Sequence, residues 1–273
     1  MKTIVVATDF SASALQAARF AGQIANDQKA GLLLINAWQT WPDSPAKVGA
    51  YPLSAEEARK GSEGNLHHLA HDLTKEFGTY LSIRCLSLEG HARAVIREVI
   101  NDEHADLLVM ATVGTAPQSA QLMGSVATHM VAHTDVPLLL IPPGASYAGM
   151  KNIMLGIDLA SPPDVATFNK AMTFAHAFGS TLNVLCVSDK PDEPATHEQT
   201  TKLRDLLSQQ PHTLTIEARQ GALHQALIAF AHKTKSDLIV LLPQPHNWLV
   251  SLWKEGETQH VARLTDIPLL ALV

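Results

Sequence analysis

The chain has 273 residues, which is long for one ordinary domain and suggests roughly two. Hydrophobic residues make up 46% of it and charged residues 17%, a balance that is typical of folded globular proteins and excludes a largely disordered chain. The formal net charge of -6 and the pI near 6.1 argue against a nucleic-acid partner, which would require a basic surface.

The apolar runs are too short for a membrane span, which needs about 18 consecutive apolar residues. The first run meets Asp9 too early for a signal peptide. We therefore expect a cytoplasmic protein with no membrane partner. Cys85 and Cys186 lie within apolar runs, which favours small buried side chains over a disulfide or a thiolate metal site.

Short aliphatic runs alternate with helical patterns along the first half of the chain. The runs predict strands at residues 3–7, 32–37, 81–86, 106–111 and 136–141. After the first strand, Ser13 and Gln16 have capping-box spacing, and an alanine stripe predicts a helix packed closely on a sheet. The stripe consists of Ala14, Ala17, Ala18, Ala21 and Ala25.

Further helices are predicted around the third and fourth strands. Residues 38–61 are rich in Pro, Gly and Ser and predict a loop, which leads into an amphipathic helix over 62–77. Residues 91–104 predict another helix, whose apolar stripe consists of Ala92, Val95, Ile96, Val99 and Ile100. After the fourth strand, Gly124 and Ser125 begin the helical segment SVATHMVAH.

The second half of the chain repeats the first. The repeated segments are KTIVVATDF and KNIMLGIDL, DLLVMA and DLIVLL, and TDVPLLLI and TDIPLLAL. A Pro/Gly-rich stretch at 142–151 separates the copies, so we expect domains at 1–146 and 147–273. In the second copy, Ser161 followed by Pro162 predicts a helix opening.

Continuous apolar strands separated by helices predict a parallel sheet covered on both faces. The expected fold class is α/β: two tandem doubly wound, Rossmann-like domains, each a five-stranded parallel sheet with helices on both faces. In such a sheet a ligand binds beyond the carboxyl ends of the strands where the winding reverses, here between the first and fourth strands. Asp9 follows the first strand and Gly114 follows the fourth, so we expect both at this crevice.

The loop after the fourth strand has two interpretations. Glycine allows close approach to an anion and amides at a helix start favour negative charge, so the backbone near 124–127 could face phosphates. Alternatively, Gly114 only serves a turn and Ser125 only caps a helix. Neither G-x-x-x-x-G-K-[ST] nor G-x-G-x-x-G occurs in the chain, which disfavours a P-loop ATPase and a dinucleotide dehydrogenase.

With these features the chain resembles a tandem universal stress protein. Nucleotide-binding members of that family carry G-x2-G-x9-G-[S/T] after the fourth strand and an Asp at the end of the first. The corresponding residues here are Ala111, Gly114, Gly124 and Ser125, so the first glycine alone is replaced. The resemblance covers both halves through the repeated segments quoted above.

The resemblance implies an adenine-nucleotide site in the first copy, for ATP, ADP or AMP, alone or with Mg²⁺. The residues implied beside the nucleoside are Thr8, Asp9, Ala37, Met110, Ala111 and Val113. Those implied beside the ribose and phosphates are Gly114, Gly124, Ser125, Val126 and Ala127.

The second copy keeps Asp158 but not the loop, whose positions hold Leu242, Pro245, Glu255 and Gly256. The proline removes an N–H donor, and a carboxylate at a phosphate position would repel an anion. We therefore interpret this copy as degenerate and expect one nucleotide per chain.

Three functions remain open: an ATP-binding regulator of the stress response, a slow ATPase, and a partner-docking scaffold that no longer binds nucleotide. Hydrolysis needs a group that positions water, and the loop offers no general base, so binding without dedicated catalysis is favoured and no catalytic residue is assigned. Histidine pairs four residues apart, such as His129 and His133, lack an HEXXH arrangement and predict exposed helix residues rather than a metal site.

The resemblance also bears on assembly. Related single-domain proteins dimerise through their final strands, and bare apolar sheet edges are avoided in native proteins. We therefore expect the two copies to form an intrachain pseudo-dimer through residues 136–141 and 267–273, and a homodimer of the whole chain remains open.

Overall fold

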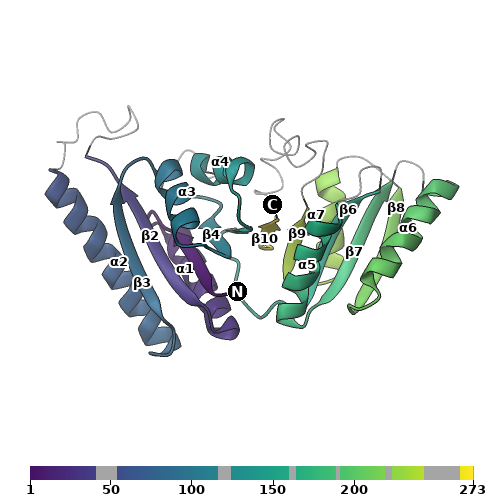
Figure 1. Ribbon diagram of the computed structural model, residues 1–273, viewed down its shortest axis with the longest axis horizontal. Coiled ribbons are helices and arrows are strands. Elements are labelled where there is room, and N and C mark those ends of the chain that lie inside the picture. Colours follow the sequence, from purple (N-terminus) through teal and green to yellow (C-terminus); the bar gives the residue numbers. More distant parts are fainter. Residues whose placement is uncertain are drawn as a thin grey trace. The chain divides into compact units, whose positions relative to one another are not determined.

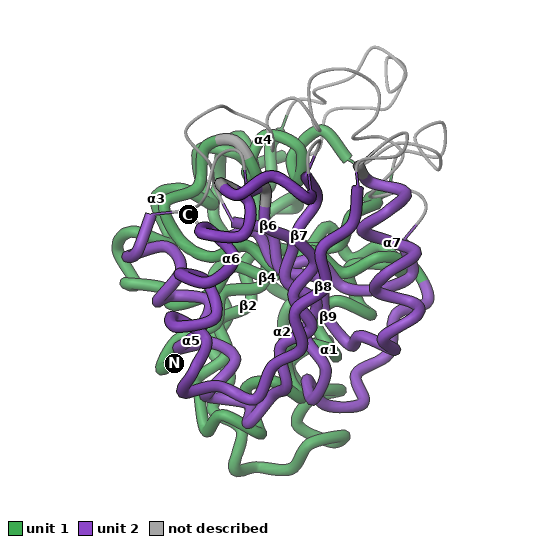
Figure 2. Tube along the Cα trace, turned by 90° about the vertical axis from the view of Figure 1, so that its right-hand side faces the viewer, with its two compact units in different colours: residues 1–119, 124–143 green, residues 120–123, 144–273 purple. Residues whose placement is uncertain are grey.

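The computed structural model describes residues 1–40, 54–115, 124–159, 164–188, 191–218, 223–242 and 265–272. The chain divides into two compact units, the first ending at Pro143 and the second beginning at Gly144 (Figure 2). Each unit contains its own set of strands and helices and is described by itself below.

The sheet of the first unit has the strand order β3-β2-β1-β4-β5, and all of its described pairings are parallel (Figure 1). Its strands are β1 (Thr3–Ala7), β2 (Gly31–Trp38), β3 (Ile83–Glu89), β4 (Leu107–Ala111) and β5 (Leu138–Ile141). Its helices are α1 (Ala12–Gln28), α2 (Ala55–Phe77), α3 (Ala92–Asp102) and α4 (Ser125–His133). The doubly wound α/β fold predicted from the sequence is therefore confirmed for this unit.

The helices cover both faces of this sheet. Helices α1 and α2 contact each other and the strands of one face, whereas α3 and α4 contact each other on the opposite face. The alanine stripe of α1 is buried as predicted, which lets its backbone approach the sheet closely. The central strands β1 and β4 are almost entirely buried, as continuous apolar runs require.

Two helix starts differ from the sequence prediction. Helix α1 is capped by Ser11, whose hydroxyl accepts from the Ala14 amide at 3.2 Å, and not by Ser13. Helix α2 begins at Ala55 behind a capping box of Ser54 and Glu57, so residues 55–61 are helical where a loop was predicted. The rest of the inserted loop, residues 41–53, lies outside the described residues.

The second unit has the equivalent strand order β10-β9-β6-β7-β8, again with parallel pairings. Its strands are β6 (Asn152–Asp158), β7 (Thr181–Ser188), β8 (His212–Ala218), β9 (Leu238–Leu241) and β10 (Leu269–Ala271). Its helices are α5 (Val165–Phe178), α6 (Pro194–Leu207) and α7 (Leu223–Lys233). Helix α5 is capped by Asp164, while the predicted opening at Ser161 and Pro162 lies outside the described residues.

A repeated aspartate has the same structural role in both units. In the first unit, Asp106 at the start of β4 accepts from the backbone amide of Thr3 at 2.9 Å. In the second, Asp237 before β9 accepts from the amides of Lys151 and Asn152 at 2.8 and 2.9 Å. Each carboxylate thus ties the start of the fourth strand to the start of the first, which explains the leading Asp of both repeated segments.

Neither cysteine forms a disulfide. Burial raises the pKa of the Cys186 thiol to about 12, as expected for a small buried side chain. Cys85 is only partly buried, and burial raises its pKa as well. Among the helices of the described residues, none is long and apolar enough to cross a membrane.

Candidate functional site

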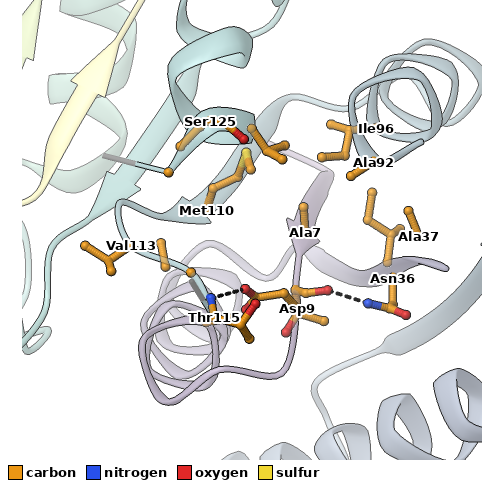
Figure 3. A pocket seen from close by; sticks show the side chains of 18 residues that line it. Ala7, Asp9, Asn36, Ala37, Ala92, Ile96, Met110, Val113, Thr115 and Ser125 are labelled. Atoms are coloured by element: carbon orange, nitrogen blue, oxygen red, sulfur yellow. Dashed lines mark hydrogen bonds between the residues drawn. The ribbon is translucent and has the colours of Figure 1, made fainter. Parts of the chain in front are cut away.

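A cavity of about 350 Å³ opens in the first unit at the carboxyl ends of β1, β2 and β4 (Figure 3). Every residue of the set predicted from the sequence lines it, namely Thr8, Asp9, Ala37, Met110, Ala111, Val113, Gly114, Gly124, Ser125, Val126 and Ala127. The structure adds residues that sequence reasoning missed: Ala7, Ala14, Ile35, Asn36, Ala92, Ile96 and Thr115. The cavity therefore occupies the crevice where the sheet reverses its winding.

Asp9 joins the loops that follow β1 and β4. Its Oδ2 accepts from the Thr115 amide at 2.8 Å, and its Oδ1 accepts from the Ser11 amide at 3.0 Å. The residue after it, Phe10, has a φ of 60°, which is unusual for a non-glycine residue. Its amide donates to Thr8 Oγ1 at 3.0 Å, so the turn is held on both sides of the aspartate.

Gly114 is required by crowding beside Asp9. A Cβ at this position would lie 2.7 Å from Asp9 Oδ2, closer than side chains tolerate. The glycine therefore lets the β4 loop pass close to the carboxylate that anchors it. This is a structural reason for Gly114 that does not depend on a ligand.

Gly124 has no comparable structural requirement. Its φ of -57° suits any residue, and a Cβ there would meet its nearest neighbour, the Thr112 carbonyl oxygen, at an ordinary 3.7 Å. It is the N-cap of α4 and has no side chain that could accept from a first-turn amide, whereas Ser, Thr or Asp at this position would cap the helix. The glycine thus leaves open space where a capping side chain would otherwise stand.

The amides at the start of α4 differ in availability. The Gly124 amide donates to the Thr112 carbonyl at 2.8 Å, so it is already used, contrary to the expectation that it faces a phosphate. The amides of Ser125, Val126 and Ala127 belong to the first helical turn, where N–H groups have no intrahelical acceptor. Any anion at this helix start would therefore bind these three amides.

A chain of polar side chains supports the cavity from behind. Asn36 of β2 donates from Nδ2 to the Thr8 carbonyl at 2.7 Å and accepts at Oδ1 from Ser62 of α2 at 2.8 Å. Ser87 of β3 donates to Ser62 at 2.7 Å. Asn36 could have been found from the sequence, because it is the one polar side chain in an otherwise apolar predicted strand and directly precedes Ala37.

The two ends of the cavity differ in charge. Asp9 is the only ionisable residue among the described residues that line it. Ser125 lies on the opposite side of the cavity from Asp9, with the Met110 side chain between them (Figure 3). At the Ser125 end, just outside the lining, Arg93 donates from Nη2 to the Ser125 carbonyl at 3.4 Å. One end thus offers a carboxylate, and the other offers amides and a cation.

The described residues contain no cluster of three or more His, Cys, Asp or Glu that could hold a metal ion. His129 and His133 stack on each other on α4, with ring centroids 4.1 Å apart. Of the degenerate loop predicted for the second copy, Pro245, Glu255 and Gly256 lie outside the described residues, while Leu242 is buried after β9.

Two tandem domains of this doubly wound type define a duplicated α/β protein. The family model described as "Universal stress protein family" matches residues 1–142 and 149–272. The chain therefore belongs to the universal stress protein family, as its motifs indicated.

Known relatives agree with this assignment. A universal stress protein of Methanocaldococcus jannaschii is 30% identical over 142 residues, which cover 51% of this chain and 81% of the relative. The crystal structure of a universal stress protein from Archaeoglobus fulgidus is similar over 99% of this chain and 95% of its own, with a TM-score of 0.72 and 12% identity. A putative universal stress protein from Pseudomonas aeruginosa matches over 100% and 93%, with a TM-score of 0.66 and 14% identity. These two structures bear on the fold alone.

Proposed function

We propose that the first domain binds an adenine nucleotide, with ATP as the expected ligand, and that the protein is a nucleotide-responsive regulator in the stress response. The observation that carries the proposal is the convergence of the predicted residues on one cavity of about 350 Å³, within the size range of small-molecule sites. Its polarity runs from a carboxylate at one end to helix amides at the other, which matches a ligand with hydroxyls at one end and anions at the other.

The proposed pose follows from this polarity. The apolar side chains of Ile96 and Met110 and the backbone near Ala37 offer a mostly apolar space for the base. Asp9 retains acceptor capacity for a ribose hydroxyl, since a carboxylate can accept about four hydrogen bonds. The phosphates then reach the first turn of α4, where amides without an intrahelical acceptor and the helix dipole favour negative charge.

Magnesium would be held mainly by the phosphates and water. Asp9 is the only carboxylate among the described lining residues, and both of its oxygens already accept backbone amides. Mg²⁺ bound with nucleotides commonly keeps several waters and uses one or two carboxylates. In this proposal the nucleotide can therefore bind with or without Mg²⁺.

The same geometry favours binding over hydrolysis. A phosphoryl-transfer site needs a group that positions the attacking water near the terminal phosphate. Asp9 lies at the opposite end of the cavity from Ser125 and is held by two amides. Slow ATPase activity remains the alternative, and release of phosphate from ATP by the purified protein, abolished in a variant that binds no ATP, would favour it.

Calorimetric titration of the full chain with ATP, ADP, AMP and GTP tests the proposal. Replacing Gly124 with Glu places a carboxylate beside the proposed phosphates, and its repulsion should cost them at least one charge-assisted hydrogen bond to the α4 amides, so ATP affinity should fall at least roughly tenfold. Gly124→Ala is the matched control, because a Cβ fits there without crowding. Absence of adenine-nucleotide binding in the parent would instead favour the docking-scaffold alternative.

The domain limits 1–146 and 147–273 remain our proposal. The compact units divide at Pro143 and Gly144, and the family matches end at 142 and resume at 149. Limited proteolysis followed by mass analysis tests the limits, since cleavage is expected between the two matches.

We also propose that the two domains pair through β5 and β10, each of which is the outermost strand at one end of its own unit's sheet. The carbonyls of Pro137 and Ile141 face β4. Because backbone groups alternate along a strand, the amides of Leu138 and Leu140 point away from β4. Slow hydrogen exchange at these two amides is expected if the strands pair, and exchange at the unprotected rate would contradict it. Light scattering tests for a homodimer of the whole chain.

A further inference from the structure

A group of four basic side chains lies where α3 and α4 pack together. It consists of Arg93 and Arg97, one turn apart on α3, and of His129 and His133, one turn apart on α4. We call it the basic cluster. Both arginines are exposed, and neither forms an ion pair within the described part of the chain. Near neutral pH the two arginines carry the positive charge, while the imidazoles are mostly neutral and offer ring N–H donors.

The basic cluster stands beside the proposed phosphate end of the cavity. The neighbour of Arg93 on α3, Ala92, lines the cavity, and Arg93 itself reaches the Ser125 carbonyl at 3.4 Å. Ser125 also supplies one of the first-turn amides of α4. The Arg93 guanidinium therefore contacts the residue that supplies the first of these amides, and Arg97 lies one helical turn further along α3.

Electrostatics within the basic cluster agree with this position. The pKa of His129 is lowered by partial burial and then by the positive charges of His133, Arg93 and Arg97. The field at this point is thus positive and reaches across from α3 to α4. It attracts an anion in proportion to the charge that the anion carries.

We propose that Arg93, with Arg97 behind it, binds the outer phosphates of the nucleotide and makes the site selective for nucleoside di- and triphosphates over monophosphates. This inference rests on the proposed function, since it assigns the ligand class of the same cavity. The α4 amides hold the phosphate nearest the ribose in every case, whereas the guanidinium acts only on phosphates beyond it. Arginine suits this role because its planar fork can bind two phosphate oxygens.

The test compares ATP, ADP and AMP affinities of the full-length parent with those of Arg93→Gln, Arg97→Gln and Arg93→Lys. ATP affinity is expected to fall about five- to tenfold in Arg93→Gln, the range for an exposed charged hydrogen bond, and less in Arg97→Gln. AMP affinity is expected to change less than about twofold, because AMP lacks the outer phosphates. Arg93→Lys keeps the positive charge but loses the planar guanidinium, so its ATP affinity should lie between that of the parent and that of Arg93→Gln.

Arg59→Gln is the matched control. Arg59 lies on α2, which covers the face of the sheet opposite to α3, and it pairs with Glu63. Arg59→Gln therefore changes the net charge as much as Arg93→Gln does, at a site remote from the cavity. Its nucleotide affinities should equal those of the parent, and thermal melting should show all variants folded.

The outcomes separate the two proposals. A loss confined to ATP and ADP in Arg93→Gln, together with a weaker dependence of ATP affinity on salt, supports the inference. Equal losses for ATP and AMP, or no loss for either, overturn it while leaving nucleotide binding intact. A parent that binds none of the three nucleotides overturns both the proposed function and this inference.

Discussion

Replacing Gly114 with Ala should weaken nucleotide binding by displacing the Asp9 carboxylate. The new Cβ would stand 2.7 Å from Asp9 Oδ2, so the carboxylate must move by several tenths of an ångström. That movement lengthens or breaks its 2.8 Å bond from the Thr115 amide. A hydrogen bond to a charged group contributes about 1.5–3 kcal/mol, and the exposure of Asp9 places the loss near the lower end.

A loss of about 1.5 kcal/mol corresponds to roughly a tenfold decrease in ATP affinity, if the displaced carboxylate no longer meets the ribose. Isothermal titration calorimetry of the parent and of Gly114→Ala measures this directly. AMP and ATP should lose affinity equally, because both carry the ribose that Asp9 is proposed to bind.

Gly64→Ala supplies the control, since Gly64 is exposed on α2 and a Cβ there meets no atom within 4 Å. This exchange should leave affinity unchanged and raise the free energy of unfolding by about 0.5–1 kcal/mol, the helix-propensity gain. If Gly114→Ala binds ATP as tightly as the parent, the Asp9 carboxylate has no part in holding the ligand, and the proposed pose is wrong.

Other predictions concern the rest of the first domain and the stoichiometry. Removing the buried Ser62 hydroxyl in Ser62→Ala leaves Asn36 and Ser87 without their partner and should lower the free energy of unfolding by about 1–3 kcal/mol in urea titrations. Calorimetry should saturate at one adenine nucleotide per chain, and saturation at two would show that the second domain binds as well. Because His129 binds its proton more weakly in the folded chain, stability falls as pH decreases through its ordinary pKa, and His129→Gln should lose less stability over that range. In NMR titrations the pKa of His129 should rise in Arg97→Gln and again when ATP is bound.

Much of the fold could be predicted because its periodic patterns are strong. Strand β1 has the predicted bounds, and β4 and α4 agree to within a residue, since long apolar runs and a glycine before a helix leave few alternatives. The residue at which a helix begins was harder to predict. Ser11 and Ser13 both precede the alanine stripe, and the sequence pattern does not show which hydroxyl reaches a free amide.

In the cavity, too, the sequence pattern predicted positions but not the contacts between them. The motif located Gly114, Gly124 and Ser125, because their spacing is a property of the sequence. It did not reveal that a side chain at position 114 would clash with Asp9, whereas one at position 124 would not. This difference depends on distances between loops that are separate in the sequence. Arg93 was missed for the same reason: it reaches the site from α3, and no spacing in the chain connects it with Ser125.

The hydrogen bond from the Gly124 amide to the Thr112 carbonyl joins the two ends of the segment that leads from β4 to α4. Since the closure of this segment is fixed at its base, lengthening it adds only a small entropic cost, which grows with the logarithm of its length. Insertions in the chain between Thr112 and Gly124 therefore need not displace the start of α4, whose position this bond helps to fix.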